Sequence, residues 1–93
     1  MTSKIRVGGI DYTIEMVPQL AERYNLYGQV TYDDSHIQID DSLSLTRTNE
    51  VIIHELTHAI FYEAGYKDQD EELIDRIASV LHQVLRDNDF GFV

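Results

Sequence analysis

The sequence contains no cysteine and no tryptophan, and only one proline among its 93 residues. Without cysteine no disulfide can stabilise the fold, and any zinc ligands must be histidine, aspartate or glutamate. Basic residues are also few: 7 against 17 acidic ones, a formal net charge of −10, with no basic cluster of the kind that binds phosphate backbones. We therefore expect no nucleic-acid partner. The acidity favours solubility or, alternatively, basic partners.

Long apolar stretches are missing as well. No run approaches the roughly 20 residues that cross a bilayer. The first residues, MTSKIRVGGIDYTIEMV, lack the apolar segment and the small-residue cleavage site of a signal peptide. We expect a cytoplasmic protein without a membrane partner. The length predicts a single domain, residues 1–93, with a modest core, because small domains bury only roughly 60–65% of their unfolded surface.

The first 40 residues predict two hairpins. Residues 4–17 alternate in polarity on both sides of a Gly-Gly pair, which is a two-residue hairpin turn. Pro18 ends the second strand because it has no N–H to donate. Residues 29–40 predict another hairpin, with Asp-Asp-Ser at its turn. Between the hairpins, residues 19–28 form either one helical turn or an irregular connection.

Two helices are predicted in the second half. The first covers about residues 42–64; several hydroxyl residues can cap its start, and Gly65 ends it. The second covers residues 71–87, with Asp70 as its cap. Strands followed by helices predict an α+β fold, in which a small antiparallel sheet of two hairpins packs on both helices.

The last helix and the tail carry most of the remaining apolar residues. The apolar face of the helix centres between Ile77 and Leu81 at helical spacing. Residues 88–93 follow as a tail. We expect Phe90 and Phe92 to pack back on the body of the protein.

The stretch VIIHELTHAI places two histidines, His54 and His58, four residues apart on one helical face, where both can reach one metal ion. Glu55 lies about 100° further round and flanks the metal without binding it. A helix apolar nearly all round is typically covered on both sides, so the histidines need partners inside the protein. The alternative is a histidine pair satisfied by hydrogen bonds alone.

A catalytic zinc site needs a third protein ligand. Glu71 is the first candidate because it lies at the edge of the apolar face of the last helix. Glu72, which lies nearly opposite that face, and His82 are the alternatives. Asp75 lies one turn after Glu71 and can accept the second N–H of a ligating histidine, which would fix the ring.

HELTH, followed thirteen residues after His58 by EELID, resembles the gluzincin metallopeptidases. The small chain is similar to the minimal zincin core of the ImmA/IrrE family and of related phage and prophage proteins. GGIDYTI, LYGQVTYDDSHIQID and HELTHAIFYEAGY carry this likeness. The resemblance implies a small sheet over the active-site helix, zinc as the cofactor, His54, His58 and Glu71 as its ligands, and Asp75 behind them. For a phage-encoded protein it implies the cytoplasm of a bacterial host.

The resemblance also implies hydrolysis of peptide bonds in a protein substrate. Glu55 would act as the general base on a zinc-bound water and pass the proton to the leaving amine. Tyr66 is the candidate hydrogen-bond donor to the oxyanion, with Tyr62 and His82 as alternatives. An exposed strand edge, residues 36–40, is expected to bind the substrate as an added strand.

A second function stays open: an interaction or regulatory module of a phage or its host, with a zincin fold and a structural metal that adds folding free energy. A structural site has no use for a carboxylate at Glu55, which favours the enzyme. Because so small a chain has little room for a specificity cleft, we expect a docking or activating protein partner. Nickel, cobalt or manganese fit the same ligands as zinc.

Overall fold

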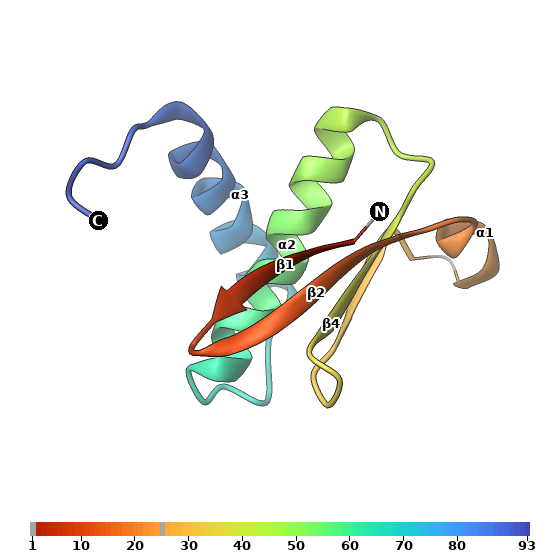
Figure 1. The fold of residues 1–93 in the computed structure, drawn as a ribbon, viewed down its shortest axis with the longest axis horizontal. Helices are drawn as coiled ribbons and strands as arrows, with labels where there is room; N and C mark the ends of the chain where they lie inside the picture. The colour runs from red at the N-terminus through yellow and green to blue at the C-terminus, as the bar shows by residue number, and fades with distance from the viewer. Residues whose placement is uncertain (1, 25) are drawn as a thin grey trace.

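Four strands form one sheet, and a long helix lies across it (Figure 1). The computed structural model describes residues 2–24 and 26–93. Its elements are β1 (Thr2–Val7), β2 (Ile10–Val17), α1 (Leu20–Tyr24), β3 (Gly28–Thr31), β4 (His36–Asp40), α2 (Leu45–Glu63) and α3 (Glu71–Asp87). The predicted α+β class is confirmed. No helix in this described part of the chain is long and apolar enough to cross a membrane.

Both predicted hairpins are present. β1 pairs antiparallel with β2, and β3 pairs antiparallel with β4. Gly8 and Gly9 have φ values of 58° and 86°, the left-handed conformation that a tight two-residue turn needs and that glycine adopts without strain. The segment after Pro18, which the sequence left open, forms the short helix α1.

The sheet as a whole is mixed, so the prediction of a purely antiparallel sheet is wrong. The strand order is β1-β2-β4-β3, and β2 runs parallel to β4. Ile37 and Ile39 of β4 are fully buried, whereas the residues of β3 are half-buried or exposed. The more apolar β4 therefore takes the inner position and β3 becomes an edge. The predicted free edge at residues 36–40 is also wrong for this reason.

α2 is positioned by its two ends and by the core. Its N-cap is Ser44, whose side chain accepts a hydrogen bond from the Arg47 N–H at 3.2 Å. It ends before Gly65, which has a φ of 103°, as predicted. The core between α2 and the sheet consists of Val7, Tyr12, Ile14, Ile37, Ile39, Val51, Leu56 and Ala59. The side of α2 turned away from the sheet is left for α3.

α3 packs on α2, and α2 is its one extensive contact within the described residues (Figure 1). It buries Ile74 and Ala78, whereas Ile77 is 40% exposed. The buried stripe is therefore not centred between Ile77 and Leu81 as the sequence predicts. The helix is rotated so that the side carrying Glu71 and Asp75 turns toward α2.

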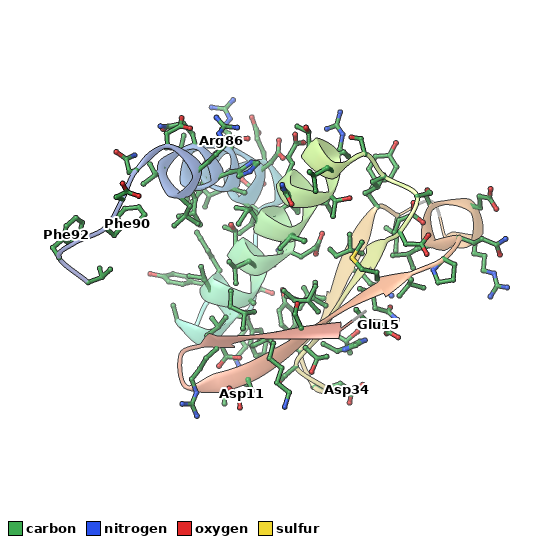
Figure 2. The ribbon with its side chains drawn as sticks, turned by 45° about the horizontal axis from the view of Figure 1, so that its top comes forward. Asp11, Glu15, Asp34, Arg86, Phe90 and Phe92 are labelled. Carbon is green, nitrogen blue, oxygen red and sulfur yellow. The ribbon has the colours of Figure 1, made fainter. Side chains whose placement is uncertain are left out.

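The tail after α3 leaves the body of the protein. Figure 2 shows Phe90 and Phe92 on a segment that projects away from the helices. Their rings contact each other edge to face at 5.9 Å between centroids, and Phe92 is 84% exposed. The prediction that Phe92 packs back on the body is therefore wrong.

Candidate metal centre

α2 and α3 bring His54, His58 and Glu71 together. One potential ligand atom from each residue lies within 4.8 Å of the others. His54 Nε2 is 2.6 Å from Glu71 Oε1, and His58 Nε2 is 3.2 Å from Glu71 Oε2. Two imidazole nitrogens and a carboxylate oxygen are a donor set that zinc prefers, so these three residues, here called the triad, could hold a metal ion.

Each helix positions its part of the triad differently. The two histidines lie on the side of α2 that faces α3, and their side chains are largely buried. Glu71 is the first residue of α3, which begins after the predicted cap Asp70. Burial pushes the pKa of Glu71 up, but the hydrogen bond with His54 and the charge of His58 outweigh burial. The pKa of Glu71 is therefore below its ordinary value, which keeps the carboxylate ionised.

Both imidazoles have a polar partner behind them. Asp75 Oδ1 lies 3.4 Å from His54 Nδ1, and Gln69 Oε1 lies 2.6 Å from His58 Nδ1. Since an amide oxygen only accepts, the Nδ1–H of His58 donates to Gln69, which leaves Nε2 as the ring nitrogen that faces Glu71. Partners of this kind fix the tautomer and the ring orientation of metal-binding histidines.

Gln69 was not singled out from the sequence, although it is held firmly. Its Nε2 donates to the backbone carbonyls of His58 and Tyr66, at 3.3 and 3.0 Å. These bonds decide which end of the amide faces the His58 ring. The one sequence signal is that Gln69 is the only amide in the charged connection between the helices. Nothing in its spacing points to His58.

Tyr32, at the end of the β3–β4 hairpin, was also missed. Its hydroxyl lies 3.4 Å from Gln69 Oε1, and its ring stacks on Tyr62 at 4.0 Å between centroids. The pKa of Tyr32 is raised, first by burial and further by the charges of Glu55 and Glu71. The hairpin tip is thus tied to α2 and to the connection before α3.

Glu55 lies on the sheet side of α2 and is 8% exposed. Its carboxylate forms no hydrogen bond within residues 2–24 and 26–93. Burial is the main cause that raises its pKa, and Glu71 adds to it, while the two histidines act in the opposite direction. No buried side-chain oxygen of the described residues lacks a hydrogen-bond partner, so the carboxylate oxygens of Glu55 reach solvent although the residue as a whole is largely buried.

The edge strand β3 approaches α2 directly over Glu55. A Cβ added at Gly28 would lie 2.7 Å from Val51 Cγ1 and 3.1 Å from Glu55 Cγ. Only glycine allows this approach without displacing the strand. The sequence placed Gly28 at the end of a connection, and the structure makes it the first residue of β3.

A cleft of about 230 Å³ opens beside this carboxylate. It lies between the beginning of β3, the first half of α2 and the middle of α3. Its lining comprises Tyr27, Gly28, Arg47, Glu50, Val51, His54, Glu55, Asp75, Ala78 and Ser79. One triad histidine and Glu55 therefore share a hollow that is large enough for a side chain of a bound peptide.

The remaining candidate ligands lie outside the triad. Glu72 forms an ion pair with Arg76 at 2.8 Å on the exposed side of α3. His82 lies further along α3, where it lines a separate hollow with Asn49 and residues of α2. Neither residue joins the triad among the described groups that could hold a metal.

The predicted oxyanion donors are not gathered at the triad either. Tyr66 is 62% exposed, and its ring packs against Phe61 at 5.8 Å between centroids. The ring of Tyr62 lies between Tyr32 and the ammonium group of Lys67, which is 3.9 Å from its centroid. Tyr66 contributes a backbone carbonyl to Gln69, and its role as a donor stays a prediction.

Comparisons with protein-family models, curated proteins and solved structures gave no match to this chain. The case for a function therefore rests on the chemistry and geometry of its own residues.

Proposed function

We propose that the protein is a zinc-dependent metallopeptidase of the gluzincin type, similar to the small ImmA/IrrE-like proteins of phages and prophages, and that it acts in the cytoplasm of a bacterial host. One observation carries this proposal. The carboxylate of Glu55, a residue that is 8% exposed and forms no side-chain hydrogen bond among the described residues, lies beside two histidines and a glutamate that converge on one point. If the two histidines were only a hydrogen-bonded pair, the Glu55 carboxylate beside them would have no role.

The donor set fits zinc. His54 and His58 offer Nε2 atoms whose opposite ring nitrogens face polar partners, and Glu71 offers an ionised carboxylate. Three protein ligands leave one coordination position for water or substrate, as catalytic zinc sites require. Bound zinc supplies Lewis-acid activation of a water and of the scissile carbonyl.

Glu55 is the proposed general base. Its burial raises its pKa, which makes the carboxylate a better proton acceptor than an exposed glutamate. It takes a proton from the attacking water and delivers it to the leaving amine. Tyr66 remains a candidate hydrogen-bond donor to the oxyanion. Tyr32 is a second candidate, because the charges of Glu55 and Glu71 act on its hydroxyl and raise its pKa.

The substrate is proposed to bind along β3. This strand is an edge of the sheet, so one side of its backbone has no strand partner among residues 2–24 and 26–93 and can pair with an extended peptide. Its first residue, Gly28, contacts the Glu55 side chain, which places the edge next to the proposed base. A protein substrate or docking partner would use this edge rather than β4, which is paired on both sides.

The first experiment is the metal content of the purified protein. We expect about one zinc per chain, lost in Glu71→Ala and retained in Glu72→Ala, the matched control that removes a carboxylate paired outside the triad. Zinc-loaded wild type should then hydrolyse peptides. Glu55→Gln should keep the metal and lose at least about 100-fold in kcat, since general-base catalysis contributes typically 10²–10⁴-fold. A protein that binds no zinc would overturn the proposal.

A second candidate is an interaction module with a structural metal. It is favoured by the attachment of α3, which has its one extensive described contact with α2 and buries only Ile74 and Ala78. A metal joining the triad would fasten α3 to the body and add folding free energy. Zinc binding with a raised melting temperature, but without hydrolysis of any peptide, would select this function over the enzyme.

A further inference from the structure

We propose that the cleft beside the triad binds a lysine or arginine side chain of the substrate, which makes the protein selective for basic peptide sequences. This inference rests on the proposed function, because it takes the cleft to be part of a peptide-binding site. It adds the class of residue that the site prefers.

The floor of the cleft suits an aliphatic chain. Gly28, Val51 and Ala78 line it, and the last two are 8% and 4% exposed. None of the three carries a polar side-chain atom, and glycine and alanine leave space above the backbone. The methylene stem of a lysine or arginine packs on such a surface while its charged end stays in a polar environment.

The charged groups of the cleft are mostly acidic. Glu50, Glu55 and Asp75 contribute carboxylates, and Arg47 contributes the one cation among the lining residues. Glu55 is 8% exposed, its carboxylate has no hydrogen bond in the described part of the chain, and the residue lines this hollow. A cationic side chain in the cleft would bring positive charge close to these carboxylates, of which Glu55 forms no hydrogen bond within the described residues.

The surroundings strengthen this preference. The segment from residue 66 to 79 carries five acidic residues and two basic ones. Both bases are engaged: Lys67 lies over the Tyr62 ring and Arg76 pairs with Glu72. The whole chain has a net charge of −10. A cleft lined mostly by one sign of charge concentrates ligands of the other sign and repels its own, so acidic peptides should be disfavoured.

Arg47 provides an internal competitor. Its guanidinium lies 2.7 Å from Glu50 Oε1, and both side chains are about half exposed. An exposed ion pair of this kind contributes little free energy, so a substrate cation can displace Arg47 from Glu50. Removing Arg47 should therefore increase the preference for basic peptides, whereas removing the Glu50 charge should reduce it.

The test uses the zinc-loaded protein and a random-sequence peptide library, with cleavage products identified by mass spectrometry. We expect lysine or arginine to be enriched about tenfold over norleucine at one fixed position beside the cleaved bond, the size of a charge-assisted hydrogen bond. Glu50→Gln should reduce this enrichment to about twofold, and Arg47→Gln should increase it. Glu72→Gln is the matched control, since it removes the same charge outside the cleft and should leave the enrichment unchanged.

The outcomes separate this inference from the function on which it rests. Cleavage without a basic preference, or with a preference that Glu50→Gln does not change, overturns the inference and leaves the peptidase standing. If no peptide is cleaved, the affinities of lysine and norleucine peptides for the zinc-loaded wild type test the inference instead. Tighter binding of the lysine peptide that depends on Glu50 supports a basic-peptide cleft without peptidase activity. Equal binding overturns the inference.

Discussion

The two helices that build the triad differ in how firmly the protein holds them. The α2 side chains are mostly buried: 22% exposed for His54 and 13% for His58. The α3 side chains are 71% exposed for Glu71 and 73% for Asp75. α2 lies across the sheet, whereas α3 rests on α2. The core therefore sets the α2 half of the site, and the α3 half depends on its packing against α2 and on its polar bonds to the histidines.

The largest expected difference comes from two isoleucines that are both fully buried, Ile39 in the sheet and Ile74 in α3. Large-to-small changes of this kind cost about 2–5 kcal/mol. We expect the cost of Ile39→Ala to lie near the upper end of this range, because the core between α2 and the sheet surrounds Ile39. Urea denaturation should therefore show a lower global stability. Ile74→Ala should lie near the lower end.

Hydrogen exchange provides the control for this pair. In Ile74→Ala the added exchange should be confined to α3, because α3 can detach locally while the core stays folded. In Ile39→Ala it should rise throughout the sheet and α2. Equal losses of stability, with exchange raised everywhere in both variants, would contradict the difference between the two halves.

The next effect concerns the polar partner of His58. Gln69→Leu removes the acceptor of the Nδ1–H bond and should weaken zinc affinity about 10–100-fold, the usual cost of losing a partner of a metal-binding histidine. Gln69→Glu keeps an acceptor oxygen and should retain most of the affinity. Zinc titration measures both variants, and NMR of the His58 ring nitrogens should show that only Gln69→Leu populates the other tautomer. An unchanged affinity in Gln69→Leu would remove Gln69 from the site.

The smallest expected effect is a change of stability with pH that arises from the carboxylate of Asp40 in the sheet. Asp40 is 1% exposed, and it accepts hydrogen bonds from the Ser42 hydroxyl and the Ala21 N–H. The Ser42 bond is the main cause that lowers the pKa of Asp40, and burial opposes it. Because the folded pKa lies below the unfolded one, the stabilisation is full above about pH 3.9 and is lost as the pH falls through the folded pKa.

Melting temperatures of wild type and Asp40→Asn should therefore differ at neutral pH and converge in acid. Asp41→Asn is the matched control, because it removes the same charge from the exposed neighbouring residue. A difference between wild type and Asp40→Asn that stays constant down to about pH 2.5 would show that the charge of Asp40 does not contribute.

Parts of the fold and site that depend on neighbours in sequence were predictable. The Gly-Gly turn, the cap Asp70 and the stop at Gly65 follow from local backbone chemistry, and all three are present. The spacing of His54 and His58 follows from the helical repeat, which puts both on one face in any helix. The hairpins were correct for the same reason, since each is a local unit.

Features that depend on distant contacts were missed. The mixed sheet was missed, and the free edge was placed at residues 36–40, because burial of Ile37 and Ile39, not adjacency in sequence, placed β4 inside the sheet. Gln69 was overlooked because only the folded connection before α3 brings it to His58, and Tyr32 because only the hairpin tip brings it to Gln69. Phe92 was misplaced because its apolar character does not reveal whether a surface is near enough to cover it.

The sequence by itself determined which reactive side chains are present and their spacing: two histidines and a glutamate within one helical turn, and acidic side chains at the start of the next helix. The tertiary structure decided how they meet. The rotation of α3 brings Glu71, and not Glu72, to the two histidines. The edge of β3 at Gly28 covers Glu55. The reason is physical: helical periodicity fixes angles within one element, whereas the distance between two elements depends on how their apolar faces pack.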